Sequence, residues 1–359
     1  MQFRTLSSLQ LVPAGMTTYL PILLTILLQL LHSCSGAADD QTGQRSERSW
    51  QDVWTYDGLQ APEYWGNLHS AWKLCGTGKR QSPIDLQADK LLYDPELDRF
   101  EMDSGTVSGT INNTGRGVTF HVQSGKDIIV SEGPLSYKYA LYSINLHFGP
   151  MADVTFDGDV PKITGSEHTV DGKAYPAEIQ LQFYNTELYG HMGGYDKAVE
   201  SPNGLAMIGI FVMIGNETSR ELNKLTSLEN LQSLVYKGSS VNVSNLNVKR
   251  LLPETTDYVT YEGSLTTPGC HETVSWILMN KPLYITSYQL DSLRELLRTE
   301  RARPARVIGK NYRPTQELRY RTIRTNIERK ETSITDSTKK CPQYKRQYKY
   351  KVNRLPRRL

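Results

Sequence analysis

Short runs of alternating apolar and polar residues follow one another between Gln81 and about Ile285, and turn residues separate them. Such alternation is typical of strands with one buried face. Two stretches, 217–234 and 286–300, instead carry apolar residues at helical spacing, and the second opens with a Thr or Ser that can cap a helix. The pattern predicts a mainly β protein with few helices. The clearest strand segments are GTINNTG, GVTFHV, YSINLHFG, AEIQLQFYN, LAMIGIFVMIG and TVSWILM.

The start of the 359-residue chain has the features of a secretory signal. Arg4 gives a weakly positive beginning, an apolar run extends from Tyr19 to Leu31, and the small residues SCSGAA follow at once. Because that run is too short to span a bilayer stably, we favour a cleaved signal over residues 1–38 rather than an uncleaved anchor. No other segment approaches the length of a membrane span. We therefore expect a secreted, extracellular protein with a disordered leader at 39–48 and a folded domain at 49–327.

The C-terminal end carries a marked charge asymmetry. The chain has a formal net charge of +3, yet residues 319–359 hold 14 Lys and Arg against 3 Asp and Glu. Residues 328–359 are predicted to be a flexible basic arm on an acidic body. In a secreted chain the arm favours anionic glycans or an acidic protein face over nucleic acid, and solvated charge without a partner is the alternative.

The cysteines and glycosylation sequons fit an oxidising compartment. Removal of the signal leaves Cys75, Cys270 and Cys341. An odd count indicates one intramolecular bridge and one thiol that is either free or joined to another chain. The sequence also has three N-glycosylation sequons, at Asn112, Asn216 and Asn242.

Two of the predicted strands carry polar side chains on one face. Side chains two apart on a strand share a face, so Asn145 and His147 point the same way, as do Glu178, Gln180 and Gln182. If the strands are neighbours, Asn145, His147 and Gln180 surround a common point. Three histidines there would make a tetrahedral zinc site with one open position. This sequence has one histidine, which is either the remnant of a metal site or a hydrogen-bonded core residue.

Several motifs, taken in order, resemble the α-carbonic anhydrase family from about Trp54 to about Ile327. They are WGNLHSAWKLCGTGKRQSPIDL, SINLHFG, GSEHTVDGKAYPAEIQLQFYN, SPNGLAMIGIFVMIG, YEGSLTTPGCHETVSWILMNKPLYIT and NYRPTQEL. The resemblance implies a single α+β domain with a large, mostly antiparallel central sheet and a few peripheral helices. In that family a catalytic zinc lies at the bottom of a conical cleft.

The resemblance places the three zinc ligands at Asn145, His147 and Gln180, of which only His147 keeps the ligand type. Amide oxygens are poor zinc ligands, so zinc binding is expected to be lost or weak, and no cofactor is predicted. A weak metal held by His147 with amides and water is the alternative. The proton-shuttle position is Arg116, whose guanidinium stays charged and cannot relay protons.

The other functional positions of the family are partly kept. The resemblance assigns hydroxide orientation to Glu167 and Thr266, and it assigns Glu178 to the support of the ligands. It places the substrate pocket at Gln182, Met207, Leu265 and Trp276. Gln182 brings an amide, and Met207 brings extra bulk, to positions where the family keeps small apolar residues. The resemblance also implies a Cys75–Cys270 disulfide, which leaves Cys341 as a free or intermolecular thiol, and a cis peptide bond at Ser82-Pro83.

Taken together, these features are similar to those of the secreted carbonic anhydrase-related proteins of the X/XI branch. The resemblance implies a protein without carbonate dehydratase activity, with a role in extracellular protein binding or scaffolding and a neurexin-like partner at the neuronal surface. The alternative is a weakly active zinc lyase or esterase that uses a rearranged ligand set. Metal analysis and CO2 hydration assays separate these hypotheses.

Overall fold

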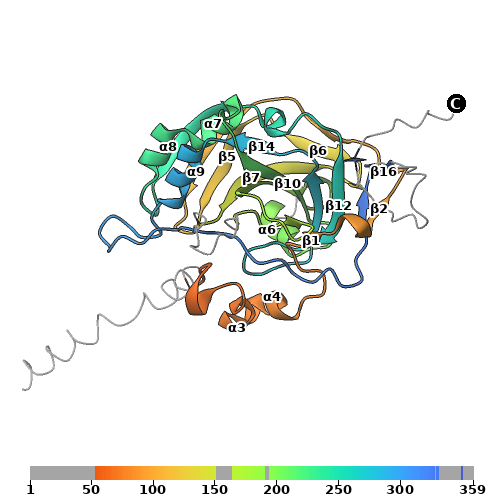
Figure 1. The fold of residues 1–359 in the computed structure, drawn as a ribbon, viewed down its shortest axis with the longest axis horizontal. Helices are drawn as coiled ribbons and strands as arrows, with labels where there is room; N and C mark the ends of the chain where they lie inside the picture. Colours follow the sequence, from red (N-terminus) through yellow and green to blue (C-terminus); the bar gives the residue numbers. More distant parts are fainter. Residues whose placement is uncertain (1–52, 151–163, 191–193, 328, 331–348, 351–359) are drawn as a thin grey trace, which may run out of the picture. The chain divides into compact units, whose positions relative to one another are not determined.

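The computed structural model describes residues 53–150, 164–190, 194–327, 329–330 and 349–350, and its main feature is a large mixed sheet (Figure 1). Ten strands form one hydrogen-bonded path in the order β11-β4-β5-β7-β9-β10-β13-β12-β15-β2. Their bounds, in that order, are Ser240–Leu246, Val107–Asn113, Val118–Gly125, Tyr139–Phe148, Ala177–Asn185, Leu205–Ile214, Val274–Met279, Tyr258–Gly263, Ile323–Thr325 and Leu91–Tyr93. Three further strands join this sheet at its side: β3 (Phe100–Met102), β6 (Ile129–Glu132) and β14 (Leu283–Ile285).

Most pairings in this sheet are antiparallel. The exceptions are β10 with β13, β10 with β14, and β15 with β2, which are parallel. Two small ladders lie apart from the sheet: β1 (Asp85–Leu86) with β8 (Thr169–Val170), and β16 (Arg329–Lys330) with β17 (Lys349–Tyr350). The predicted fold class, a mainly β domain with a large and mostly antiparallel sheet, is confirmed.

The two faces of the sheet have different environments because side chains alternate along each strand. On β7, Ile144, Leu146 and Phe148 face the larger core, while the residues between them face the opposite side. That opposite side holds a second apolar cluster around Trp276 on β13 and β12. Over β5, β7 and β9 it carries polar residues instead. The strand pattern thus leaves one region of this face open for a site.

The helices are short. Three of them, α7 (Arg220–Thr226), α8 (Leu228–Ser233) and α9 (Ser287–Arg294), pack together against the larger core (Figure 1). The helix predicted over 217–234 is two helices, because Ser227 ends the first and its side chain accepts a hydrogen bond from the N–H of Asn230. The second prediction, at 286–300, is correct at its start, where Thr286 and Gln289 form a capping box, but the helix ends at Arg294.

Other helical segments are single turns. The α-helical ones are α3 (Trp65–Leu68), α4 (Leu74–Thr77), α5 (Thr186–Tyr189) and α6 (Gly194–Val199). Four 3-10 turns lie at Gly58–Gln60, Ser70–Trp72, Ala88–Lys90 and Val248–Leu251. Within the described part of the chain, no helix has the length and apolar character needed to cross a membrane.

An aromatic cluster close to the start of the described chain is tied to the rest of the domain by a disulfide. Trp54, Tyr56 and Trp65 contact one another edge to face, with ring centroids 5.2–5.7 Å apart. Trp65 packs with the Cys75–Cys270 bridge, which joins residues 195 positions apart. The predicted disulfide is confirmed, as is the cis Ser82-Pro83 peptide bond.

The remaining boundary predictions fall on residues that are not described. They concern the signal at 1–38, the leader at 39–48, Cys341 and most of the arm at 328–359. The described residues from Trp54 to Ile327 belong to one compact unit.

Candidate functional site

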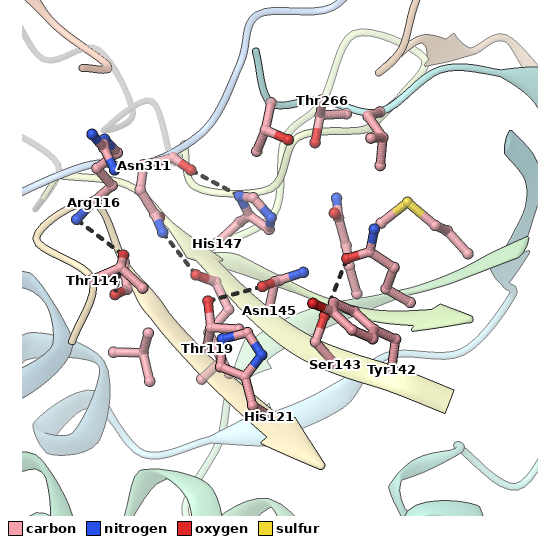
Figure 2. A pocket seen from close by; sticks show the side chains of 18 of the residues that line it. Thr114, Arg116, Thr119, His121, Tyr142, Ser143, Asn145, His147, Thr266 and Asn311 are labelled. Carbon is pink, nitrogen blue, oxygen red and sulfur yellow. Dashed lines mark hydrogen bonds between the residues drawn. The ribbon is translucent and has the colours of Figure 1, made fainter. Parts of the chain in front are cut away.

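A cavity of about 330 Å³ opens on the polar part of the sheet face (Figure 2). Strands β5, β7, β9 and β10 form its floor, and the residues between β4 and β5 form part of its rim. In the strand register, Asn145 lies directly opposite Gln180, and Ser143 lies opposite Gln182. The cavity therefore brings together the three positions Asn145, His147 and Gln180, as the period of two predicts.

His147 is buried and held in one orientation. Its Nδ1 lies 2.8 Å from the carbonyl oxygen of Asn311, and a carbonyl only accepts hydrogen bonds. Nδ1 therefore carries the proton, and in the neutral ring Nε2 is an acceptor. The Asn311 side chain fixes the arrangement further, because it donates to the carbonyl of Leu146 and accepts from the N–H of Phe148. His147 Nδ1 also lies 3.5 Å from the carboxylate of Glu167.

Gln180 is bound to two buried carboxylates. Its Nε2 donates to Glu167 Oε2 at 2.8 Å and to Glu178 Oε1 at 3.0 Å. All three side chains are at most 1% exposed. Because carboxylates accept and do not donate, these bonds determine which end of the amide is which. The amide nitrogen therefore points toward Glu167 and Glu178, and Oε1 faces the cavity.

Glu178 is the centre of a hydrogen-bond network beneath the cavity. It accepts from the backbone N–H groups of Glu167 and His168 at 3.0 and 2.9 Å, and from Nδ1 of His168 at 2.9 Å. Burial acts to raise the pKa of Glu178, but the charge of His168 and the hydrogen bonds from His168 and Gln180 outweigh it, so the pKa is lowered. Glu178 is therefore a stable, charged anchor under the strands.

The network continues away from the cavity. His168 Nε2 lies 2.7 Å from the hydroxyl of Tyr261, which in turn lies 2.9 Å from Oγ of Ser82. Nδ1 of His168 donates to the Glu178 carboxylate, and Nε2 shares the second hydrogen bond of the ring with the Tyr261 hydroxyl. Burial is the main cause that raises the pKa of Tyr261, which keeps that hydroxyl protonated.

Asn145 sits at the centre of the cavity floor and is bound on one side only. Its Oδ1 accepts from the hydroxyl of Thr119 on β5 at 2.9 Å (Figure 2). Its Nδ2 points away from Thr119, toward the open space. Within the described residues Nδ2 has no hydrogen-bond partner.

The predicted pocket positions lie only partly on the cavity wall. Gln182, Met207 and Leu265 line it, and Gln182 Nε2 donates to the Tyr195 hydroxyl at 2.6 Å. Trp276 is not among the lining residues: the indole is fully buried beside Met207, its register partner, and donates to the carbonyl of Ser264. The Trp276 ring stacks parallel to Tyr261 in the neighbouring core.

The two positions assigned to hydroxide orientation, Thr266 and Glu167, lie at different depths of the site. Thr266 lines the cavity, whereas Glu167 lies beneath it and accepts from Gln180 and from the backbone N–H of Arg313. Among the hydrogen bonds between described residues, none joins Thr266 to Glu167. The Gln180 amide instead donates to Glu167 Oε2, the carboxylate oxygen that could otherwise accept from a hydroxyl.

Arg116 lies at the rim and is held against the aromatic cluster. Its Nε donates to the carbonyl of Trp54 at 3.0 Å, and its guanidinium lies 4.3 Å from the centre of the Trp54 ring. Trp54 and Tyr56 both line the cavity, so a segment from the beginning of the domain contributes to the site.

Sequence reasoning missed several lining residues. Thr119 and His121 share the cavity face of β5, a period-two signal that GVTFHV does contain. Tyr142 and Tyr195 stack at 3.6 Å, and both line the cavity. A register shift between Leu141 and Ser143 places Tyr142 there, and no pattern in the sequence announces it.

The eukaryotic-type carbonic anhydrase family profile matches residues 60–327. The chain belongs to this family. A Caenorhabditis elegans protein named carbonic anhydrase-like protein 2 is 40% identical over 297 residues, which cover 80% of this chain and 82% of that protein. The resemblance expected the family's zinc ligands at Asn145, His147 and Gln180, and these residues lie in the cavity described above.

The residues present at this carbonic anhydrase site do not fit a zinc ion. Gln180 offers the cavity only its amide oxygen, which is a poor zinc ligand. Asn145 turns its NH2 group, which cannot act as a ligand, toward the cavity. Only Nε2 of His147 is a suitable donor, and a catalytic zinc site needs three protein ligands. In the described parts of the chain, no group of three or more His, Cys, Asp or Glu side chains could hold a metal ion.

Proposed function

We propose that this protein is a secreted carbonic anhydrase-related protein that lacks carbonate dehydratase activity and acts by binding other molecules. The observation that carries the proposal is the hydrogen bonding of Gln180. Gln180 stands at a predicted ligand position, yet its amide donates to Glu167 and Glu178, so the side chain belongs to the hydrogen-bond network beneath the cavity. Without a metal to lower the pKa of a bound water, the cleft has no hydroxide nucleophile near neutral pH.

The supporting network gives a physical reason for an intact fold without catalysis. Glu167 and Glu178 are buried, and a buried carboxylate without partners is costly. The Gln180 amide satisfies both, so the substitution is stable in itself. The domain then supplies a rigid surface rather than a reaction centre.

The extracellular part of the proposal rests on other features. The Cys75–Cys270 disulfide suits an oxidising compartment. Of the three sequon asparagines, Asn216 and Asn242 are exposed and Asn112 is half-buried. We propose a cell-surface protein, of the neurexin kind that the X/XI branch suggests, as partner, with the basic arm and Cys341 as further points of attachment.

An activity assay on restored ligands tests the first part. Purified wild-type chain should give no CO2 hydration above the uncatalysed rate, whereas Asn145→His with Gln180→His, with and without Gln182→Val, should gain zinc-dependent hydration. A control with two histidines on the exposed surface, Gln123→His with Ser244→His, should stay inactive. Zinc-dependent turnover by the wild type would support the rearranged zinc enzyme instead.

Capture of surface proteins tests the second part. The full chain, a chain truncated after Lys330, and Cys341→Ser should be compared as baits for neuronal surface proteins. Specific capture that falls on truncation assigns binding to the arm, and capture that becomes reducible only with Cys341 present assigns a covalent link. Capture of no surface protein by the full chain would contradict the binding role.

A further inference from the structure

Three atoms that face the cavity have no hydrogen-bond partner among the described residues. They are Nδ2 of Asn145, Oε1 of Gln180 and Nε2 of His147, because the other polar atoms of these side chains are already bound. Gln180 and His147 are 1% and 5% exposed, so these are nearly buried side chains that present one free polar atom each. Their orientation is fixed by their inner bonds.

The three atoms form a defined pattern of one donor and two acceptors. Asn145 and Gln180 are opposite each other on β7 and β9, where facing side chains are in contact range. One hydroxyl could accept from Asn145 and donate to Gln180, and a second hydroxyl could donate to His147. The Tyr195 hydroxyl, which accepts from Gln182, adds another donor at the wall.

The electrostatics of the cavity favour an uncharged ligand. No Asp or Glu is among the lining residues, so a cation in the cavity finds no carboxylate to contact directly. Beneath the floor lie Glu167 and Glu178, which disfavour an anion. Burial lowers the pKa of His121, so that ring is neutral near pH 7. Arg116 is at the rim and already contacts Trp54.

A sequon lies on the same row of the sheet. Asn112 on β4 is opposite Thr119 on β5, and Thr119 is opposite Asn145 on β7. Two strand spacings separate Asn112 from Asn145, which is about 10 Å. Asn112 is half-buried on the face that carries the cavity, so a glycan attached there starts within reach of it.

We propose that the former metal cleft is a binding site for a neutral sugar residue, whose adjacent hydroxyls bond to Asn145, Gln180 and His147. The inference rests on the proposed function, since it needs a metal-free cleft and an extracellular setting. Two sources can supply the sugar: the chain's own glycan at Asn112, or a glycan of another molecule. A cavity of about 330 Å³ is within the size range of small-molecule sites.

The test uses N-acetylglucosamine as the probe on the full chain after enzymatic deglycosylation, followed by ligand-observed NMR or calorimetry. The wild type should bind the neutral probe in the millimolar range and should bind cationic glucosamine and anionic glucuronate more weakly. Asn145→Leu should weaken binding about tenfold, because it removes the only cavity-facing amide donor on β7. Asn145→Asp, which keeps the acceptor for Thr119 and the shape, should weaken it as well.

Gln123→Leu is the matched control, because Gln123 is exposed on β5 outside the cavity. It should leave probe binding unchanged. No binding to the deglycosylated wild type, or binding that both Asn145 variants leave intact, would overturn the inference. That failure is distinct from failure of the proposed function, which CO2 hydration and zinc content decide without any sugar.

A second arm identifies the source. If the glycan on Asn112 occupies the cleft, glycosylated wild type should bind the probe at least about tenfold more weakly than glycosylated Asn112→Gln, since a tethered ligand competes at high effective concentration. Equal binding by the two proteins assigns the site to a glycan of another molecule.

Discussion

Replacing Gln180 by leucine should destabilise the domain much more than the same replacement at its neighbour across the strands. Gln180→Leu removes two hydrogen bonds to buried carboxylates, of Glu167 and Glu178. A hydrogen bond to a charged group contributes about 1.5–3 kcal/mol, so the loss is about 3–6 kcal/mol. The apolar side chain returns about 1–2 kcal/mol by burial. The free energy of unfolding should therefore fall by about 1–5 kcal/mol, with a central value of about 3 kcal/mol.

Asn145→Leu is the matched control, because it also replaces an amide in the same row. Asn145 makes one side-chain hydrogen bond, to Thr119, whose half-buried hydroxyl can turn to water. Its free energy of unfolding should change by about 1 kcal/mol or less. Urea denaturation with the disulfide intact measures both variants, and the difference should appear as a shift in midpoint of about 1 M. If the two variants unfold within about 0.5 kcal/mol of each other, the Gln180 network is not the anchor described here.

Three more predictions concern the same domain. The pKa of Glu178 is lowered in the folded protein, so its contribution to the free energy of unfolding is complete above the ordinary glutamate pKa of about 4.3. This contribution is lost as the pH falls through the folded pKa. Urea midpoints should therefore decline with falling pH in that window, and Glu178→Gln should flatten the decline. Reduction of the Cys75–Cys270 bridge, or Cys75→Ser with Cys270→Ser, should cost about 2–5 kcal/mol in the free energy of unfolding, and an unchanged melting temperature would contradict this. Arg313→Met should lower the free energy of unfolding by about 3–5 kcal/mol in urea denaturation, because the buried guanidinium donates to the carbonyls of Cys75 and Ser82. Equal stability of the variant and the wild type would mean that those carbonyls find other partners.

The strand faces and the cluster at the cavity floor follow from the sequence. A period of two determines that Asn145 and His147 share one face of their strand, and that Gln180 and Gln182 share one face of theirs. The register that places Asn145 opposite Gln180 is also compatible with that pattern. The motifs resembling carbonic anhydrases added which strands are neighbours and which cysteines pair.

Contacts between distant segments could not be predicted in the same way. Asn311 orients His147 from 164 residues further along the chain, and Arg313 reaches Cys75 across 238 residues. Local patterns carry no information on such contacts. The place of Trp54 on the cavity wall, where its ring contacts Arg116, was likewise not predictable from local patterns. The full burial of Trp276 also depends on its packing in the folded domain.

The split of the 217–234 helix has a local cause that the apolar spacing conceals. Ser227 has a non-helical backbone conformation, which ends the first helix, and its side chain caps the second. Serine at this position competes for backbone hydrogen bonds, which favours a cap over a helix interior.

Zinc content tests the central claim most directly. The wild-type chain should be equilibrated with excess zinc, dialysed against metal-free buffer at neutral pH, and analysed for bound metal beside Asn145→His with Gln180→His. We predict far less than stoichiometric zinc in the wild type and stoichiometric zinc in the restored variant, because only the latter has three imidazole ligands at the cleft floor. Stoichiometric zinc in the wild type, lost on His147→Ala, would contradict the account.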